Sequence, residues 1–235
     1  PASEFQRGIA FNADLQSGAL ASQWNGNAHA LGFNFTANSY TSPYVNFFGQ
    51  ADVINSSHGF TDPGGSNPFT IALDGLADKN PSTTFVVSAG NDGANANTVG
   101  SPGSGYNAIT VGALANDGAN NYNAIAGFSS RGPQDYSDPV NGTALGARAA
   151  VDITAPGTDL TGAYYGGQTG GNDPNLPGSP DGVLGGPAFY SGGLSGTSFA
   201  SPITAGAATL INSASYNDVG LAAKPASRDA RVEKA

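Results

Sequence analysis

Apolar residues in this chain occur in short runs, and within several runs neighbouring positions are both apolar, as in 85–87. Because successive side chains of a β-strand point to opposite faces, a strand of this kind is buried on both faces. Such strands are typical of a parallel sheet that is covered by helices on each side. We therefore expect an α/β fold with a doubly wound, mostly parallel β-sheet and helices on both faces.

The expected strands are 9–15, 28–35, 51–56, 84–89, 108–114 and 151–154. A helix is expected over 69–79, because Asn67-Pro68 supplies an N-cap and a first-turn proline ahead of apolar residues at three- and four-residue steps. Together with the strands at 51–56 and 84–89, this helix forms a βαβ unit.

A second helix is expected over 198–212, and its many small residues predict that it lies buried in the centre of the fold. The segments 116–123 and 166–193 are rich in Gly and Asn and are expected to be surface loops. No stretch has the composition of a linker, so we expect residues 1–235 to form a single domain.

Charged residues are few and mostly acidic: 17 Asp and Glu against 8 Lys and Arg give a net charge of −9. Nucleic acid is therefore not an expected partner, because phosphate binding needs a basic surface. No apolar run approaches the roughly 20 residues that a membrane-spanning helix needs. The chain has no Cys, and therefore neither a disulfide nor a thiolate metal site. It also has no Met, so we expect Pro1 to be an internal residue of a longer precursor. Residues 228–235 resemble the opening of a helix that stops without a cap, so we expect the fold to be incomplete at both ends.

The clearest chemical signal is the segment 195–202, where a glycine-rich stretch turns directly into the small-residue helix. Ser198 lies in the first turn, where free backbone N–H groups and the helix dipole would favour an alkoxide and a neighbouring oxyanion. A serine at such a position also commonly acts only as a helix cap. The rest of the sequence has to decide between these two roles.

The stretch Gly196 to Pro202 matches the motif Gly-Thr-Ser-x-Ala-x-Pro, and in it the chain resembles the subtilisin-like serine peptidases, or subtilases. Further segments resemble family segments in the same order along the chain: 8–15, 51–59, 85–93, 100–103, 108–113, 128–132 and 152–157. The resemblance covers nearly the whole chain and implies a subtilisin-like fold and a serine endopeptidase that hydrolyses peptide bonds in proteins. It implies that Ser198 is the nucleophile, and that the Asn91 side-chain amide and the Ser198 backbone N–H form the oxyanion hole.

The family's catalytic Asp and His motifs, Asp-Ser/Thr-Gly and His-Gly-Thr-x-Val-Ala, do not occur in this chain. His29 lacks a following Gly-Thr and is expected on a strand, and His58 stands where the family usually has an apolar residue beside a substrate subsite. Neither is therefore expected to be the catalytic base. Two interpretations remain: the Asp and His precede Pro1 in an active peptidase, or the chain is a non-catalytic homologue that kept the fold.

The resemblance also implies that peptide binds as an added strand along the segments 57–59 and 88–90, and that small residues leave room for a large side chain in the first pocket. The residues expected to bind substrate are Ser57, His58, Gly59, Ser88, Ala89, Gly90 and Gly100. We expect a bulky apolar residue before the scissile bond, with Asp92 at the rim tolerating a basic one.

The family further implies a monomer that acts outside the cell or at its surface on a polypeptide substrate and needs no cofactor for its chemistry. Structural calcium is frequent in subtilases, but no ligand pattern in this chain assigns a metal site.

Two other functional classes compete with the peptidase. An acidic extracellular module could bind a peptide or partner protein in the same groove without cutting it. A carbohydrate-binding all-β domain would suit the Gly, Asn and aromatic content, but it conflicts with the helices expected at 69–79 and 198–212.

Overall fold

The computed structural model describes residues 8–18, 36–116, 118, 121–163 and 190–235. Its main sheet has four parallel strands: β1 (Val53–Ser56), β2 (Thr84–Ser88), β3 (Ile109–Ala115) and β7 (Ile153–Pro156). β2 lies between β1 and β3, and β3 also pairs with β7 and, antiparallel, with the short strand β4 (Ala124–Ile125). The register places Ile54 opposite Phe85, and Val87 opposite Thr110.

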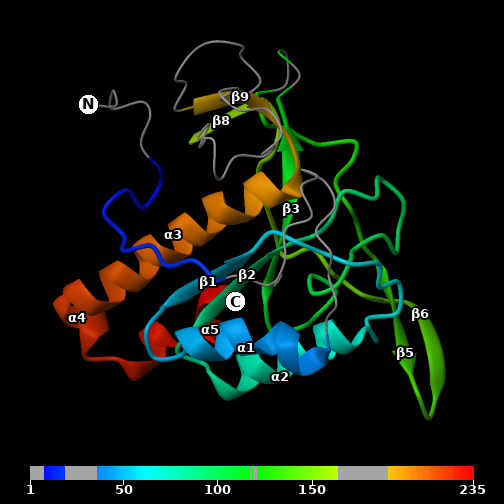
Figure 1. Cartoon of the computed structure of the whole chain (residues 1–235), viewed down its shortest axis with the longest axis horizontal. Helices are drawn as coiled ribbons and strands as arrows, with labels where there is room; N and C mark the ends of the chain where they lie inside the picture. The colour runs from blue at the N-terminus through cyan, green and yellow to red at the C-terminus, as the bar shows by residue number, and fades with distance from the viewer. Residues whose placement is uncertain (1–7, 19–35, 117, 119–120, 164–189) are drawn as a thin grey trace.

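Helices cover both faces of this sheet (Figure 1). α1 (Ala37–Phe47) and α2 (Pro68–Lys79) lie on one face, and α3 (Thr197–Asn217) lies on the other. The strand β2 shows why the sheet needs both layers, because Phe85 and Val87 pack toward α1 and α2 while Val86 packs in the cluster that contains Ala200 of α3. The doubly wound, mostly parallel α/β architecture predicted from the sequence is confirmed.

The helix predicted over 69–79 is confirmed as α2, together with the signals at its start. The Asn67 side chain accepts a hydrogen bond from the Phe69 N–H at 2.9 Å, and Pro68 occupies the first turn. The sequence analysis missed α1, which begins with a capping box between Thr36 and Ser39 and contains Pro43 in its interior. Proline inside a helical pattern usually marks its end, so this segment gave no helical signal.

Two expectations from the sequence are wrong. The segment 9–15 forms a turn, with a hydrogen bond from the Ala13 N–H to the Ala10 carbonyl, instead of a strand. A strand needs a ladder partner, and in the described part of the chain this segment has none. Its apolar residue Leu15 is 93% exposed. The helix predicted over 198–212 exists as the longer α3, but it is not buried all round, because Leu210 and Ile211 are about half exposed.

Smaller elements surround the sheet. β5 (Gln134–Asp138) and β6 (Gly142–Arg148) form a hairpin that extends from the body, and β8 (Leu160–Ala163) pairs with β9 (Tyr190–Leu194) (Figure 1). The chain ends in α4 (Val219–Ala222), the 3-10 helix Pro225–Arg228 and α5 (Ala230–Lys234).

Some sequence expectations fall partly or wholly on residues that the structure does not describe. The strand predicted at 28–35, with His29, lies outside the described residues, as does most of the loop predicted at 166–193. The end of that loop is described, and there residues 190–193 belong to β9 instead. Within the described ranges, no helix is both long and apolar enough to cross a membrane.

Candidate active site

A pocket of about 310 Å³ opens at the carboxyl ends of β1 and β2, where the two strands separate and the first turn of α3 approaches them. This is the edge at which ligands bind in open parallel sheets. All nine residues that the sequence analysis selected line this one pocket: Ser57, His58, Gly59, Ser88, Ala89, Gly90, Asn91, Gly100 and Ser198. Asp92 and Thr197 line it as well.

Ser198 is the second residue of α3 and is reached through Gly196, whose φ of 149° and ψ of 155° favour glycine. Its backbone N–H makes no hydrogen bond within the described part of the chain, as is typical of the first turn of a helix. Its Oγ donates a hydrogen bond to the Ser57 carbonyl at 2.9 Å. The site thus holds a hydroxyl and a free amide donor on the same residue.

The side chain of Asn91 is held in one orientation by Thr197. Its Oδ1 accepts hydrogen bonds from both the backbone N–H and the Oγ1 of Thr197, each at 3.0 Å. Because a backbone N–H can only donate, the amide oxygen must face Thr197 and the Nδ2 group must face away from it. The Nδ2 group has no hydrogen-bond partner among the described residues, so both of its protons are available to a ligand.

Thr197 is a residue that sequence reasoning missed, although it lies within the Gly-Thr-Ser motif. It is fully buried, and its Oγ1 also accepts a hydrogen bond from the Gly90 N–H at 3.2 Å. One side chain therefore links the turn after β2 to the start of α3. The threonine between Gly196 and Ser198 was the signal that could have identified it.

The two segments expected to pair with peptide differ in their free backbone groups. In the segment 88–90, the Ala89 carbonyl already accepts from the Gly100 N–H, and the Gly90 carbonyl accepts from the Ser130 N–H. In the segment 57–59, the only backbone group bonded to a described residue is the Ser57 carbonyl. Among the described residues, the segment 57–59 therefore has more unpaired backbone groups for an added strand than the segment 88–90.

Gly100 lies against the backbone of Phe60. A Cβ at this position would stand 2.6 Å from the Phe60 carbonyl oxygen, so a larger residue would push the backbone apart. Glycine at this position keeps the pocket open at its base.

His58 does not contact the Ser198 side chain. Its Nε2 lies 3.1 Å from the Tyr40 hydroxyl, and burial lowers its pKa to about 4, so the ring is neutral at pH 7. A base for Ser198 is therefore not found among the described residues. In the same residues, no cluster of three or more His, Asp or Glu could hold a metal ion.

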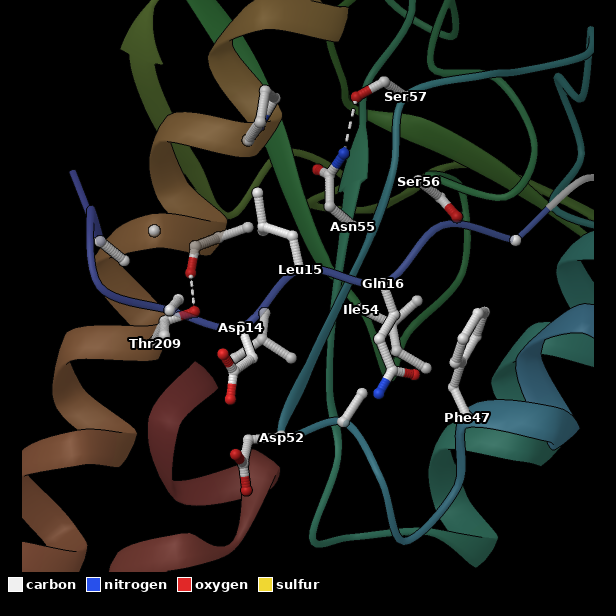
Figure 2. Close-up of a pocket in the computed structure, with 18 of the residues that line it drawn as sticks. Asp14, Leu15, Gln16, Phe47, Asp52, Ile54, Asn55, Ser56, Ser57 and Thr209 are labelled. Atoms are coloured by element: carbon white, nitrogen blue, oxygen red, sulfur yellow. Dashed lines mark hydrogen bonds between the residues drawn. The ribbon is translucent and has the colours of Figure 1, made fainter. Parts of the chain in front are cut away.

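A larger cavity of about 820 Å³ adjoins this pocket along the free edge of β1, and Ser57 and His58 line both. Figure 2 shows Asp14 and Asp52 at one end of it, and Asn55, whose amide donates to Ser57 Oγ at 3.0 Å, at the other. Ser57 and His58 thus form part of the partition between the two cavities.

The family model of the subtilases matches residues 2–232 of this chain. The chain belongs to the subtilase family. Its match to the serine protease AprX of Bacillus subtilis is 34% identical over 135 residues, which are 53% of this chain and 25% of that relative. Its match to subtilisin-like protease 2 of Pseudogymnoascus destructans is 30% identical over 177 residues, which are 74% of this chain and 33% of that relative.

Among solved structures, the subtilase chain resembles the prenylagaramide maturation protease PagA, with a TM-score of 0.50 and 24% identity. The likeness covers 79% of this chain and 52% of the PagA chain, and it supports the fold alone. This subtilase chain therefore spans a quarter to a third of the two relatives and about half of the solved structure.

Proposed function

We propose that this chain is the part of a serine endopeptidase that carries the nucleophile and the oxyanion hole. The observation that supports this most directly is the arrangement of three groups in one pocket: the Ser198 Oγ, the Ser198 backbone N–H and the Asn91 Nδ2. Acyl transfer needs a nucleophile and fixed donors for the oxygen that gains charge, and these groups supply both.

In the proposed reaction, Ser198 Oγ attacks the carbonyl carbon of the scissile peptide bond and gives its proton to a base. The carbonyl oxygen becomes an oxyanion that accepts hydrogen bonds from the Asn91 Nδ2 group and the Ser198 N–H. Because Thr197 fixes the amide of Asn91 before substrate binds, the donors need little reorganisation as charge develops. The leaving amine takes the proton from the base, and water then hydrolyses the acyl-enzyme.

The base in this proposal is a histidine, paired with an aspartate, in polypeptide that precedes this chain. Within the described residues, the Ser198 hydroxyl donates to the Ser57 carbonyl, an acceptor too weakly basic to remove its proton. Supply of the imidazole from outside this chain accounts for a preformed oxyanion hole beside a serine that has no base among the described residues.

Substrate in this proposal lies along the segment 57–59, whose backbone groups, apart from the Ser57 carbonyl, have no partner among the described residues. The first pocket is walled by Ala89, Gly90 and Gly100, and their small size favours a bulky apolar side chain before the scissile bond. The exposed Asp92 at the same pocket would tolerate a basic one.

The test is peptide hydrolysis by the longer polypeptide that contains this chain and the sequence preceding Pro1. We expect cleavage of a peptide library after large apolar residues, loss of activity in Ser198→Ala, and near-normal activity in Ser195→Ala, a control on the exposed neighbouring serine. Cleavage that survives Ser198→Ala would refute the role of Ser198, and preference for small or acidic residues would refute the pocket assignment.

A non-catalytic peptide-binding module is the second candidate, and the lack of a base among the described residues favours it. The sequence that precedes Pro1 distinguishes the two functions. A histidine in a His-Gly-Thr segment within about 25 residues before Pro1 supports the peptidase, and a substituted histidine there supports the binding module.

We further propose that the protein acts as a monomer outside the cell or at its surface, on a polypeptide substrate and without nucleic acid. The proposed chemistry requires no cofactor, because serine, histidine, aspartate and backbone donors suffice for acyl transfer.

A further inference from the structure

A chain of hydroxyl groups runs from β1 through α1 and ends at His58 in the wall of the site pocket. Ser56 Oγ lies 2.7 Å from the Tyr44 hydroxyl, and the Tyr44 hydroxyl donates to that of Tyr40 at 3.2 Å. The Tyr40 hydroxyl lies 3.1 Å from His58 Nε2. Ser56, Tyr40 and Tyr44 are all buried, so these hydrogen bonds are shielded from water.

The direction of these hydrogen bonds determines where the imidazole carries its proton. Each hydroxyl has one proton, and Tyr44 directs its own to Tyr40, so Ser56 is the donor to Tyr44. The Tyr40 hydroxyl can in turn donate to His58 Nε2, and in that arrangement Nε2 is an acceptor. The ring proton of the neutral histidine is then on Nδ1.

The His58 ring is also held in place by its neighbours. Its centroid lies 5.6 Å from that of Tyr40 at an interplanar angle of 74°, and 6.1 Å from that of Phe60 at 68°. Its Nδ1 has no hydrogen-bond partner among the described residues, and it is not an enclosed atom, so it is open to the cavities that His58 lines. In that tautomer, the wall presents an Nδ1–H donor that has no partner among the described residues, one residue from Ser57.

We propose that His58 is a specificity-determining residue whose Nδ1–H donates a hydrogen bond to the side-chain carbonyl of an Asn or Gln in the bound peptide. This inference rests on the proposed function, because it concerns a peptide that lies along 57–59. An apolar side chain would cover Nδ1–H without accepting from it, which disfavours binding. A carboxylate is disfavoured by Asp92 in the same pocket and by the net charge of −9.

The test is peptide binding followed by NMR on the 235-residue chain labelled with ¹⁵N in histidine. The chain has two histidines, so His29→Gln identifies the signals of His58 and serves as the matched control. The probes are alanine tetrapeptides with Gln at one position in turn, and the same peptides with norleucine in place of Gln. Norleucine has nearly the same length as Gln and lacks the carbonyl.

We expect the free chain to show the Nδ1–H tautomer at His58. With Gln at the position beside His58, the tetrapeptide should bind roughly 2- to 10-fold more tightly than its norleucine counterpart. His58→Leu should remove this difference, and His29→Gln should preserve it. A proton on Nε2, equal binding of both series by the wild-type chain, or a preference that survives His58→Leu would overturn the inference.

These outcomes separate the inference from the proposed function. The tautomer is measured in the wild-type chain, so it is informative even where His58→Leu does not fold. Selective binding of Gln peptides by a protein that never hydrolyses them would refute the peptidase and support the role of His58. Failure of every tetrapeptide to bind would overturn both.

Discussion

At the scale of single residues, two hydrogen bonds determine which end of the Asn91 amide faces the pocket. Asn91 Oδ1 accepts both from Thr197, and this leaves the Nδ2 group for the proposed oxyanion. In the longer polypeptide, we expect Asn91→Ala to lower kcat by a factor of about 10²–10³ with little change in KM, which is the known loss on removing this type of donor in subtilisin itself. Steady-state kinetics would measure this loss, with Asn95→Ala, a change at an exposed asparagine nearby, as the control.

An unchanged kcat in Asn91→Ala would show that the amide is only a turn residue. The placement of Ser198 and Asn91 in one pocket could be predicted because both lie in recognisable local motifs. The role of Thr197 could not, because it depends on contacts with residues about a hundred positions away in the sequence.

His58 makes the stability of the chain depend on pH. Burial lowers its pKa from 6.5 to about 4, so between these values the unfolded chain binds more protons than the folded one. The free energy of unfolding should therefore fall as the pH drops from about 6.5 to about 4, by up to roughly 3 kcal/mol from this residue. Urea unfolding at several pH values should show a weaker pH dependence in His58→Gln than in the wild type. An equal pH dependence in both would contradict the burial of a neutral ring.

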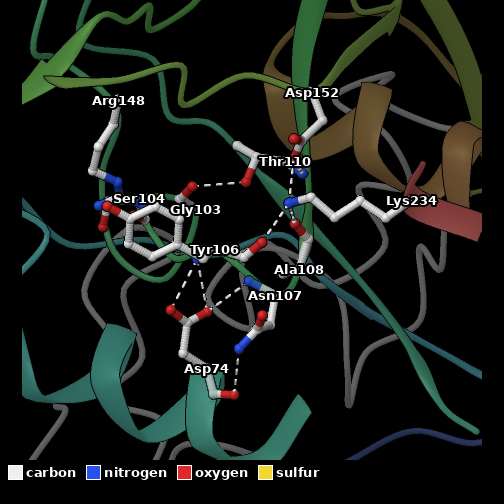
Figure 3. Close-up of polar contacts among 10 residues, drawn as sticks. All are labelled: Asp74, Gly103, Ser104, Tyr106, Asn107, Ala108, Thr110, Arg148, Asp152 and Lys234. Carbon is white, nitrogen blue, oxygen red and sulfur yellow. Dashed lines mark hydrogen bonds and ion pairs between the residues drawn. The ribbon is translucent and has the colours of Figure 1, made fainter. Parts of the chain in front are cut away.

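At the scale of elements, the short helix α5 attaches the end of the chain to the sheet (Figure 3). Lys234 Nζ donates to the Tyr106 and Ala108 carbonyls, each at 2.6 Å, and lies 3.0 Å from Asp152 Oδ2. From the opposite side, Asp74 of α2 accepts from the Tyr106 N–H at 2.8 Å. The segment before β3 is thus held between two helices.

We expect Lys234→Met to lower the free energy of unfolding by about 1–3 kcal/mol, because two carbonyls and a carboxylate lose a charged donor. Lys224→Met, at an exposed lysine outside this contact, is the matched control and should change it little. Urea midpoints would compare the two variants. Equal midpoints would mean that the Lys234 contact contributes no stability.

Elements with a strong local pattern were predicted correctly, and those that depend on a partner were not. β2 and α2 follow from consecutive apolar residues and from the Asn67 cap, both of which are local. The segment 9–15 has strand-like composition, but without a partner for its backbone groups it forms a turn. α1 was missed because Pro43 interrupts its pattern. The contact between Tyr40 of α1 and His58 was therefore missed as well.

At the scale of the whole molecule, the central proposal is that Ser198 and Asn91 form an oxyanion hole for which the described residues provide no base. The Ser198 hydroxyl donates to a carbonyl, and the histidine nearest to it in the pocket is bound to Tyr40. A serine in that state should react slowly with electrophiles, because attack requires removal of its proton.

Labelling by a serine-directed fluorophosphonate, read by mass spectrometry, tests this claim most directly. We predict strong labelling of Ser198 in the longer polypeptide that includes the sequence before Pro1, and little labelling of the 235-residue chain alone. Strong labelling of the isolated chain that Ser198→Ala abolishes would contradict the account, because Ser198 would then have a base within this chain.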